Sequence, residues 1–249
     1  REGKVGGAFC QGIQSIRQSR ILTNFDGTYS DVVTLAHELG HAFHNVNLYD
    51  HRLLNKEYSM PVAETASTFN ENIVNNAAYA AAQTDGERLA ILESQLMDAC
   101  QIICDIYSRY LFATEVFAHR EEQFLPAGRL CGMMLEAQKK AYGDGLDPNF
   151  LHPYMWLCKS HYYSGSLSFY NFPYAFGGLF ARGLYARYRE EGAAFVPKYK
   201  ALLHATSVMS TEDAAAIAGI DLTDRRFWES SLESISRDID EFLRLLEKN

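Results

Sequence analysis

Hydrophobic residues recur at intervals of three or four along most of the chain, and this spacing predicts helices. The expected helices lie around residues 32–43, 62–83, 87–122, 127–142, 174–191, 193–205 and 224–246, with a short one capped at residues 210–213. Glycine-rich residues 3–25 contain the Ile21-Leu22 pair, which predicts a small β-hairpin. We therefore expect a mainly α fold, a multi-helix domain with one small hairpin or sheet near the N-terminus.

The longest of these helices is expected to run without interruption from residue 87 to about residue 122. Its hydrophobic residues are assigned to the core: Leu89, Leu92, Leu96, Ile103, Ile106, Tyr110 and Phe117. Asp85-Gly86 is expected to end the helix before it, and Pro126 to separate it from the helix after it. No linker is evident, so one domain is expected.

The helix around residues 32–43 carries the residues with the most specific spacing in the chain. Residues 28–31, Thr-Tyr-Ser-Asp, fit a capping box at its start. Within it, His37 and His41 are four residues apart, so their side chains lie one turn apart on one face and can reach a single ion. Glu38 lies beside the first histidine, and this HExxH pattern is typical of zinc peptidases.

A catalytic zinc ion typically has three protein ligands and keeps its fourth position for water. His44 is too far from His37 to share one ion, because seven residues of helix rise about 10.5 Å. A second helix, expected to start at Pro61, carries Glu64 and Glu71 two turns apart on one face. We assign Glu64 as the third ligand and Glu71 as the carboxylate that orients a ligating imidazole, although a solvated or helix-pairing role fits Glu71 equally well.

Three segments together resemble the zinc oligopeptidases that include thimet oligopeptidase and, more closely, oligoendopeptidase F. Residues 37–44, HELGHAFH, are similar to the zinc helix of that family, and residues 61–71, PVAETASTFNE, to its third-ligand helix. Residues 161–165, HYYSG, with residues 169–177, FYNFPYAFG, resemble its substrate segment. The resemblance implies a zincin-type catalytic domain over residues 1–249, the C-terminal part of a longer protein whose large N-terminal helical region is missing here.

The resemblance also implies roles for individual residues. One zinc ion per chain is expected on His37, His41 and Glu64, with Glu38 as the general base and acid that activates water and protonates the leaving amine. Cobalt or manganese could occupy the same ligands, and zinc is the default. The expected function is hydrolysis of internal peptide bonds in short oligopeptides by a zinc-dependent endopeptidase.

For the oxyanion of this reaction, the resemblance implies stabilisation by His161 and a following tyrosine. Pro173 looks like an inserted residue, so Tyr174 is preferred, Tyr170 comes second and Tyr163 is weaker still. Without the resemblance, His161 would be interpreted as a polar loop residue and the two tyrosines, four residues apart, as an aromatic pair.

Composition excludes several other classes of function. With 31 acidic and 23 basic residues, a net charge of −8 and no basic cluster, nucleic-acid binding is not expected. No hydrophobic run is long enough to cross a membrane. Five cysteines form no CxxC pair and leave an odd one over, which favours reduced thiols and a cytoplasmic location. The expected partners are oligopeptide substrates and the missing N-terminal region.

Two alternatives remain at this point. A di-iron helical bundle would need the Glu-x-x-His step twice, and Glu38-x-x-His41 occurs once. A catalytically incompetent zinc-binding fragment, which needs its missing N-terminal part or a partner, is the stronger alternative, although the intact Glu38 argues against simple decay. The other histidines are interpreted as structural or surface residues: His44, His51, His119, His152 and His204.

Overall fold

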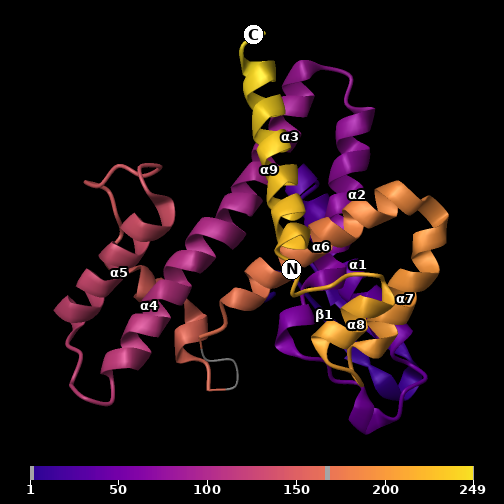
Figure 1. The fold of residues 1–249 in the computed structure, drawn as a ribbon, viewed down its shortest axis with the longest axis horizontal. Coiled ribbons are helices and arrows are strands. Elements are labelled where there is room, and N and C mark those ends of the chain that lie inside the picture. The colour runs from indigo at the N-terminus through magenta and orange to yellow at the C-terminus, as the bar shows by residue number, and fades with distance from the viewer. Residues whose placement is uncertain (1–2, 166–168, 249) are drawn as a thin grey trace. The chain divides into compact units, whose positions relative to one another are not determined.

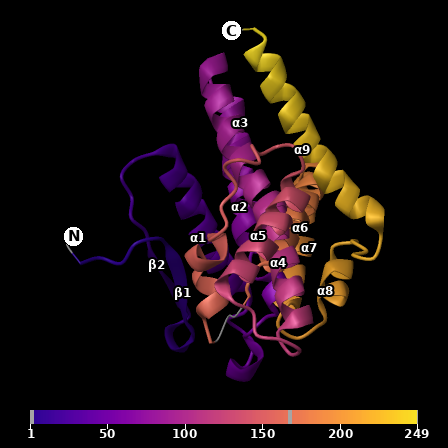
Figure 2. The ribbon, with the colours of Figure 1, turned by 90° about the vertical axis from the view of Figure 1, so that its left-hand side faces the viewer.

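The computed structural model describes residues 3–165 and 169–248, and Figures 1 and 2 show their helices and strands. Two compact units make up the chain. Arg1–Leu96 and Phe176–Asn249 together form the first unit, and Met97–Ala175 forms the second. Each unit is described by itself below.

The boundaries between the units lie inside helices and not in polar linkers. The first falls within α3 (Asp85–Cys100) and the second within α6 (Phe172–Glu191). The sequence contains no evident linker, and in the structure a continuous helix crosses each boundary. A single domain over residues 1–249 stays a prediction.

A two-stranded antiparallel sheet precedes the first helix. Strand β1 (Phe9–Ile13) pairs with β2 (Gln18–Leu22), with Phe9 opposite Leu22. Both strands pack against α1 (Tyr29–Asn47), beside which the hairpin lies in Figure 2. The predicted mainly α fold with a small hairpin near the N-terminus is confirmed.

Helix α1 begins with the predicted capping box. The backbone N–H of Asp31 donates to Oγ1 of Thr28 over 3.2 Å, and the Thr28 N–H donates to Oδ2 of Asp31 over 2.9 Å. These two bonds satisfy donors that have no partner inside the helix. The start of the helix that carries HExxH is thus fixed by local sequence.

The second predicted helix starts later than expected. Pro61 lies in a 3₁₀ turn, Met60–Val62, and α2 spans Thr65–Ala81. Glu64 is the N-cap residue, and its carbonyl accepts the N–H of Thr68 over 3.1 Å. The prediction that Pro61 starts the α-helix was wrong, because the first turn closes with three-residue instead of four-residue bonds.

Helix α2 ends two residues before the predicted position, and the break between α2 and α3 comprises residues 82–84. Helix α2 ends at Ala81, and Asp85 and Gly86 belong to the first turn of α3. The Glu87 N–H donates to Oγ1 of Thr84 over 3.1 Å, and the Thr84 N–H donates to the Glu87 carboxylate over 3.2 Å. This reciprocal cap starts α3 at a position where Asp-Gly would otherwise indicate a turn.

The predicted uninterrupted helix contains a π-helical turn. Gln101–Asp105 separates α3 from α4 (Ile106–His119). One extra residue per turn rotates the following side chains by about 100° relative to an α-helix. Tyr110 and Phe117, which follow the π turn, are 48% and 44% exposed, and their assignment to the core was wrong, whereas Ile106 is buried as predicted. Leu92, which precedes the π turn, is buried as predicted.

The remaining helices follow the predicted pattern to within about two residues at their ends. They are α5 (Ala127–Tyr142), α6, α7 (Phe195–Ala205), α8 (Thr211–Ile217) and α9 (Arg225–Leu246). Ser210 caps α8 by accepting the N–H of Asp213, and Asp224 caps α9 by accepting the N–H of Arg226. Polar N-caps before hydrophobic runs thus located these helix starts in the sequence.

Each unit has its own hydrophobic core. In the first unit, buried residues of α2, α6, α7 and α8 pack together, among them Phe69, Phe180 and Leu203. In the second, Phe112 of α4 packs with Met133 and Met134 of α5. The metal-centre residues described below extend from helices that contribute to the first core.

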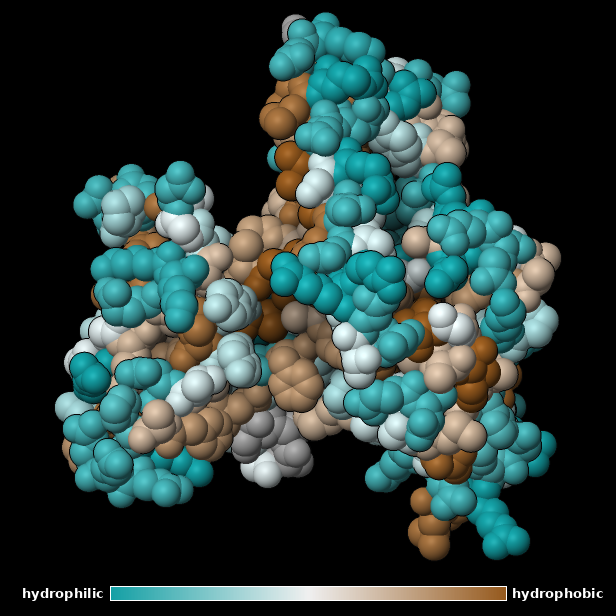
Figure 3. Space-filling view, in the orientation of Figure 1, coloured by the Kyte–Doolittle hydropathy of each residue, from teal (hydrophilic) through white to brown (hydrophobic). Residues whose placement is uncertain are grey.

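Helix α9 is amphipathic, and part of its apolar face is exposed. Figure 3 shows hydrophobic residues among the hydrophilic ones along this helix. Exposed hydrophobic side chains of α9 include Leu232, Ile239, Leu243 and Leu246. Within the described residues, no helix combines the length and the hydrophobicity that crossing a membrane requires.

Candidate metal centre

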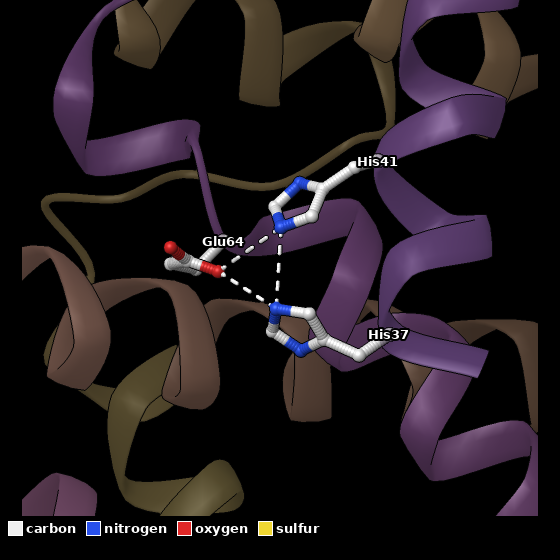
Figure 4. Close-up of side chains that lie close together, drawn as sticks. All are labelled: His37, His41 and Glu64. Atoms are coloured by element: carbon white, nitrogen blue, oxygen red, sulfur yellow. Dashed lines mark hydrogen bonds and ion pairs between the residues drawn. The ribbon is translucent and has the colours of Figure 1, made fainter. Parts of the chain in front are cut away.

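The three predicted metal ligands come together in the first unit. His37 and His41 project from the same side of α1, and Glu64 reaches them from the residue before α2 (Figure 4). The two Nε2 atoms are 3.2 Å apart. Oε2 of Glu64 lies 3.4 Å from Nε2 of His37 and 3.5 Å from Nε2 of His41. The three atoms form a nearly equilateral triangle.

This triangle has the size that a tetrahedral zinc ion requires. With zinc–ligand bonds of about 2.0–2.1 Å, ligand atoms at tetrahedral angles lie about 3.3 Å apart. The observed separations of 3.2–3.5 Å match that value without movement of the side chains. Two imidazoles and one carboxylate are also a donor set that zinc uses in catalytic sites. The residues therefore fit a metal ion, with one coordination position left open.

Two further side chains hold the ligands in place. Glu71 pairs with Nδ1 of His37, as its predicted orienting role requires. Because a carboxylate only accepts, Nδ1 carries a proton, and this bond leaves Nε2 as the ring atom that faces Glu64 and His41. Ser67 donates to Oε2 of Glu64 over 3.1 Å and to the Glu64 carbonyl over 3.0 Å.

The charges around the centre favour a cation. Burial lowers the pKa of His41, which therefore stays neutral, as a metal ligand must be. Burial also opposes protonation of His37, but its bonds to Glu64 and Glu71 outweigh burial and raise its pKa to about 10. Burial disfavours the charged form of Glu64, yet the pairing with His37 lowers its pKa overall. The carboxylates of Glu64 and Glu71 thus stabilise one positive charge, which lies on His37 in the absence of a metal ion.

Glu38 is buried at 5% exposure, and its Oε2 has no hydrogen-bond partner among the described residues. Burial raises the pKa of this carboxyl, the charge of His37 lowers it, and the nearby carboxylates Glu64 and Glu71 raise it further. A carboxylate without protein partners next to the ligands is suited to exchange protons with a small molecule such as water. It is not one of the three ligand residues.

Two glycines allow the close packing on which the centre depends. A β-carbon on Gly40 of α1 would lie 2.3 Å from the carbonyl oxygen of Ala66 and 2.5 Å from Cα of Ser67 in α2. One on Gly177 of α6 would lie 2.7 Å from Cβ of Glu64. Only glycine fits at either position unless the backbone moves.

Gly40, Gly177 and Ser67 are parts of the centre that were not predicted from the sequence. A glycine inside the HExxH helix is a signal for close packing, and could have singled out Gly40. A serine three residues after a proposed ligand is a weaker signal. For Gly177, which lies more than a hundred residues from Glu64, the sequence holds no local signal.

The residues predicted for the oxyanion lie in the second unit and form a group of their own. The ring of His161 is 5.5 Å from that of Tyr170 and 6.1 Å from that of Tyr174, and the two tyrosine rings are 4.9 Å apart in an edge-to-face arrangement. Burial lowers the pKa of His161, and the charges of Arg109 and Lys159 lower it further. Tyr163 is exposed and donates to the Trp156 carbonyl over 3.2 Å.

The segment that carries His161 is anchored on α4. The Tyr162 hydroxyl donates to the carbonyl of Arg109, and its ring packs edge-to-face against Phe112. The Phe169 N–H donates to the His161 carbonyl over 2.9 Å. These contacts hold the backbone at His161 and at the residue that follows it.

The chain is similar in sequence to one protein family and to individual oligopeptidases. Residues 1–234 match Peptidase family M3. Oligoendopeptidase F, chromosomal, from Lactococcus lactis subsp. cremoris is 27% identical over 99% of this chain, which covers 40% of that protein. Oligopeptidase PepF from Bacillus subtilis is 28% identical over 99% of the chain, which covers 37% of that protein.

A solved structure supports the fold. PZ peptidase A with inhibitor 2 superposes with a TM-score of 0.78 at 20% identity, over 97% of this chain and 43% of that chain. The chain thus spans about 40% of the length of the relatives it matches.

Proposed function

Because the chain belongs to peptidase family M3, we propose that it is the catalytic part of a zinc-dependent endopeptidase that hydrolyses internal bonds of short peptides. The observation that carries this proposal is the triangle formed by His37, His41 and Glu64, whose edges of 3.2–3.5 Å suit a tetrahedral zinc ion. The names of the relatives, oligoendopeptidase F and oligopeptidase PepF, support oligopeptides as the substrate class.

A bound zinc ion supplies a water of lowered pKa and polarises the carbonyl of the scissile bond. Glu38 accepts the proton of the attacking water and delivers it to the leaving amine nitrogen. Its burial and its unpartnered Oε2 support this role, because a raised pKa brings a carboxyl closer to the range in which it can both take up and release a proton.

Glu71 and Ser67 orient the ligands, and neither is expected to contact substrate. Glu71 fixes the tautomer of His37 and the direction of its lone pair. Ser67 restrains the carboxylate of Glu64. We propose that this support keeps the ligand triangle in place before the metal binds.

The proposed donors to the oxyanion are His161 and one tyrosine, with Tyr174 preferred over Tyr170. This assignment rests on the resemblance of the segment around them to oligoendopeptidase F and on the chemistry of the groups. Imidazole and phenol N–H and O–H groups can stabilise a developing negative charge. The low pKa of His161 favours its neutral form at pH 7, in which one nitrogen still donates.

A second candidate function follows from the share of the relatives that this chain covers. The chain spans about 40% of their length, so it could bind zinc and still need the rest of a longer protein for peptide hydrolysis. This alternative predicts the same metal centre and differs only in catalysis by the isolated chain.

Zinc content and peptide cleavage, measured together, test the proposal. The purified chain is analysed for metal and incubated with an internally quenched short peptide, with and without chelator. One zinc at the HExxH centre and chelator-sensitive cleavage would support a peptidase. Zinc without cleavage would favour the incompetent fragment, and absence of zinc would contradict the assignment of the three ligands.

Two variants make this experiment specific to the proposed centre. Glu64→Ala removes one ligand and should abolish zinc binding there and with it cleavage. Glu115→Gln removes an exposed carboxylate of α4, in the second unit, that pairs with His119, and serves as the matched control. Full zinc occupancy of the centre in Glu64→Ala would show that Glu64 is not a ligand.

A further inference from the structure

A second group of potential metal ligands lies in the first unit, outside the HExxH centre. Asp50 and His51 lie in the turn that follows α1, and His204 lies in the last turn of α7. One potential ligand atom of each lies within 4.8 Å of those of the other two. No local pattern in the sequence connects these residues, because 153 positions separate His51 from His204.

The hydrogen bonds of the group leave metal-binding atoms available. Nε2 of His51 donates to the backbone carbonyl of His204 over 2.8 Å. A carbonyl only accepts, so Nε2 carries the proton and Nδ1 keeps its lone pair. Histidine ligands almost always donate their other ring N–H to a carbonyl or a carboxylate in this way, which fixes the tautomer and the ring.

The other two residues complete a donor set. Nε2 of His204 lies 3.2 Å from Oδ1 of Asp50, and its ring lies 3.9 Å from that of His51. The pKa of Asp50 is lowered by its own backbone N–H and by the two histidines, so its carboxylate is ionised at neutral pH. The side chains of Asp50 and His204 are 73% and 44% exposed, which gives an ion and its waters access.

The group lies where α1 and α7 are already joined. In the last turn of α1, Nε2 of the buried His44 is hydrogen-bonded to Oγ1 of Thr206 over 2.8 Å. His51 and His204 extend this contact toward the surface. An ion held by them would link the end of the helix that carries His37 and His41 to α7.

We propose that Asp50, His51 and His204 form a second metal site, which takes a divalent transition-metal ion and fastens the C-terminal end of α1 to α7. Two imidazoles with one carboxylate suit zinc, nickel and copper, and do not suit calcium or magnesium, which prefer oxygen ligands. The site is structural, because its ion would stabilise the folded chain without contact with the HExxH centre. It does not depend on the proposed peptidase function.

The number of zinc ions bound per chain tests this site. Metal-free wild type and the double variant His51→Gln, His204→Gln are dialysed against a series of zinc concentrations, and bound zinc is counted. We expect the wild type to bind one zinc ion more than the double variant. His152→Gln, which removes an exposed histidine of the second unit, should match the wild type. The wild type and the double variant share the HExxH centre. The difference between their zinc counts therefore does not depend on how fully that centre is occupied.

Equal zinc counts in the wild type and the double variant would overturn the proposal. Asp50→Asn provides an independent test, because it keeps the size of an exposed side chain and removes only its charge. It should raise the Kd of the additional zinc ion by at least about tenfold, the lower end of losses seen when support for a metal site is removed. An unchanged Kd would also overturn the site, and this comparison decides the question if the double variant does not fold.

A thermal measurement examines the structural role. Saturating zinc should raise the melting temperature of the wild type by more than that of Asp50→Asn, because an ion that binds the folded chain stabilises it in proportion to its affinity. Equal shifts in the two proteins would mean that no ion fastens α1 to α7.

Discussion

Gly177 lies against Glu64 so closely that a β-carbon on the glycine would be 2.7 Å from Cβ of the glutamate. It would also be 3.1 Å from the Glu64 carbonyl carbon and 3.3 Å from its Cα. Helix α6 thus packs directly on the backbone of the proposed third ligand. The position of that ligand is set by tertiary packing as well as by its place before α2.

Gly177→Ala should therefore weaken metal binding. The new methyl group must displace the backbone of Glu64 or of α6, and a shift of the ligand by a few tenths of an ångström distorts the triangle of donor atoms. We expect the Kd for zinc at this centre to rise at least about tenfold, a loss comparable with removal of a supporting residue. Zinc titration against a competing chelator measures it.

Gly132→Ala is the control for this substitution. Gly132 is also helical, in α5, and a β-carbon there would meet nothing within 4 Å among the described residues. Its zinc affinity should equal that of the wild type. If Gly177→Ala also binds zinc as the wild type does, the packing of α6 on Glu64 does not set the geometry of the centre.

Glu71→Gln should weaken zinc binding without abolishing it. The amide can still accept a bond from Nδ1 of His37, but it lacks the negative charge with which Glu71, together with Glu64, raises the pKa of that histidine. Loss of a supporting carboxylate typically reduces metal affinity about 10–100-fold. The variant is compared with Glu64→Ala in the same titration, and the alanine variant should lose more. Wild-type affinity in Glu71→Gln would leave Glu71 as a helix-pairing carboxylate only.

Glu38→Gln should separate metal binding from catalysis. Glutamine has nearly the same shape, so the buried position and the three ligands are retained, but it cannot accept a proton. We expect the zinc content to stay at the wild-type value while kcat falls about 10²–10⁴-fold, the usual contribution of a general base. Cleavage of the quenched peptide and metal analysis of the same sample measure both. A kcat within threefold of wild type would remove Glu38 from the proposed mechanism.

The two tyrosines can be distinguished by their separate effects on turnover. Tyr174→Phe should lower kcat about 10²–10³-fold with little change in KM, as expected for a donor that acts in the transition state. Tyr170→Phe should have a smaller effect if the preference for Tyr174 is right. Tyr107→Phe, which alters an exposed tyrosine of α4 outside that segment, is the control. A larger kcat loss in Tyr170→Phe would reverse the assignment.

The sequence predicted those features that depend on neighbouring residues. The capping box at Thr28 and Asp31 and the four-residue spacing of His37 and His41 are local, and both are present in the fold. Glu64 was assigned as the third ligand from its place on the expected second helix, and the resemblance of that segment to the third-ligand helix of one family supported the assignment. Family membership and the mainly α fold were predicted in this way.

Features that depend on distant residues could not be predicted from the sequence. The π turn at Gln101–Asp105 interrupts the predicted helix before the exposed Tyr110 and Phe117, and hydrophobic periodicity cannot reveal one inserted residue in a helix. Gly177 acts on a ligand in a distant helix, and His51 meets His204 only because α1 and α7 end side by side. Such relationships arise from packing, for which a single sequence holds no local signal.

His44 should make the stability of the chain depend on pH below about 6.5. Burial, with the nearby His41, lowers the pKa of His44 to about 3, whereas in the unfolded chain it should be near the ordinary value of about 6.5. Between these values the unfolded chain binds a proton that the folded chain does not. The free energy of unfolding therefore falls as pH falls, by up to about 1.4 kcal/mol per pH unit from this group. His44→Gln removes that contribution and can still bond to Thr206. Urea unfolding of the metal-free proteins at pH 7 and pH 4.5 should show a smaller loss in the variant, and equal losses would mean that His44 takes up a proton in the folded state.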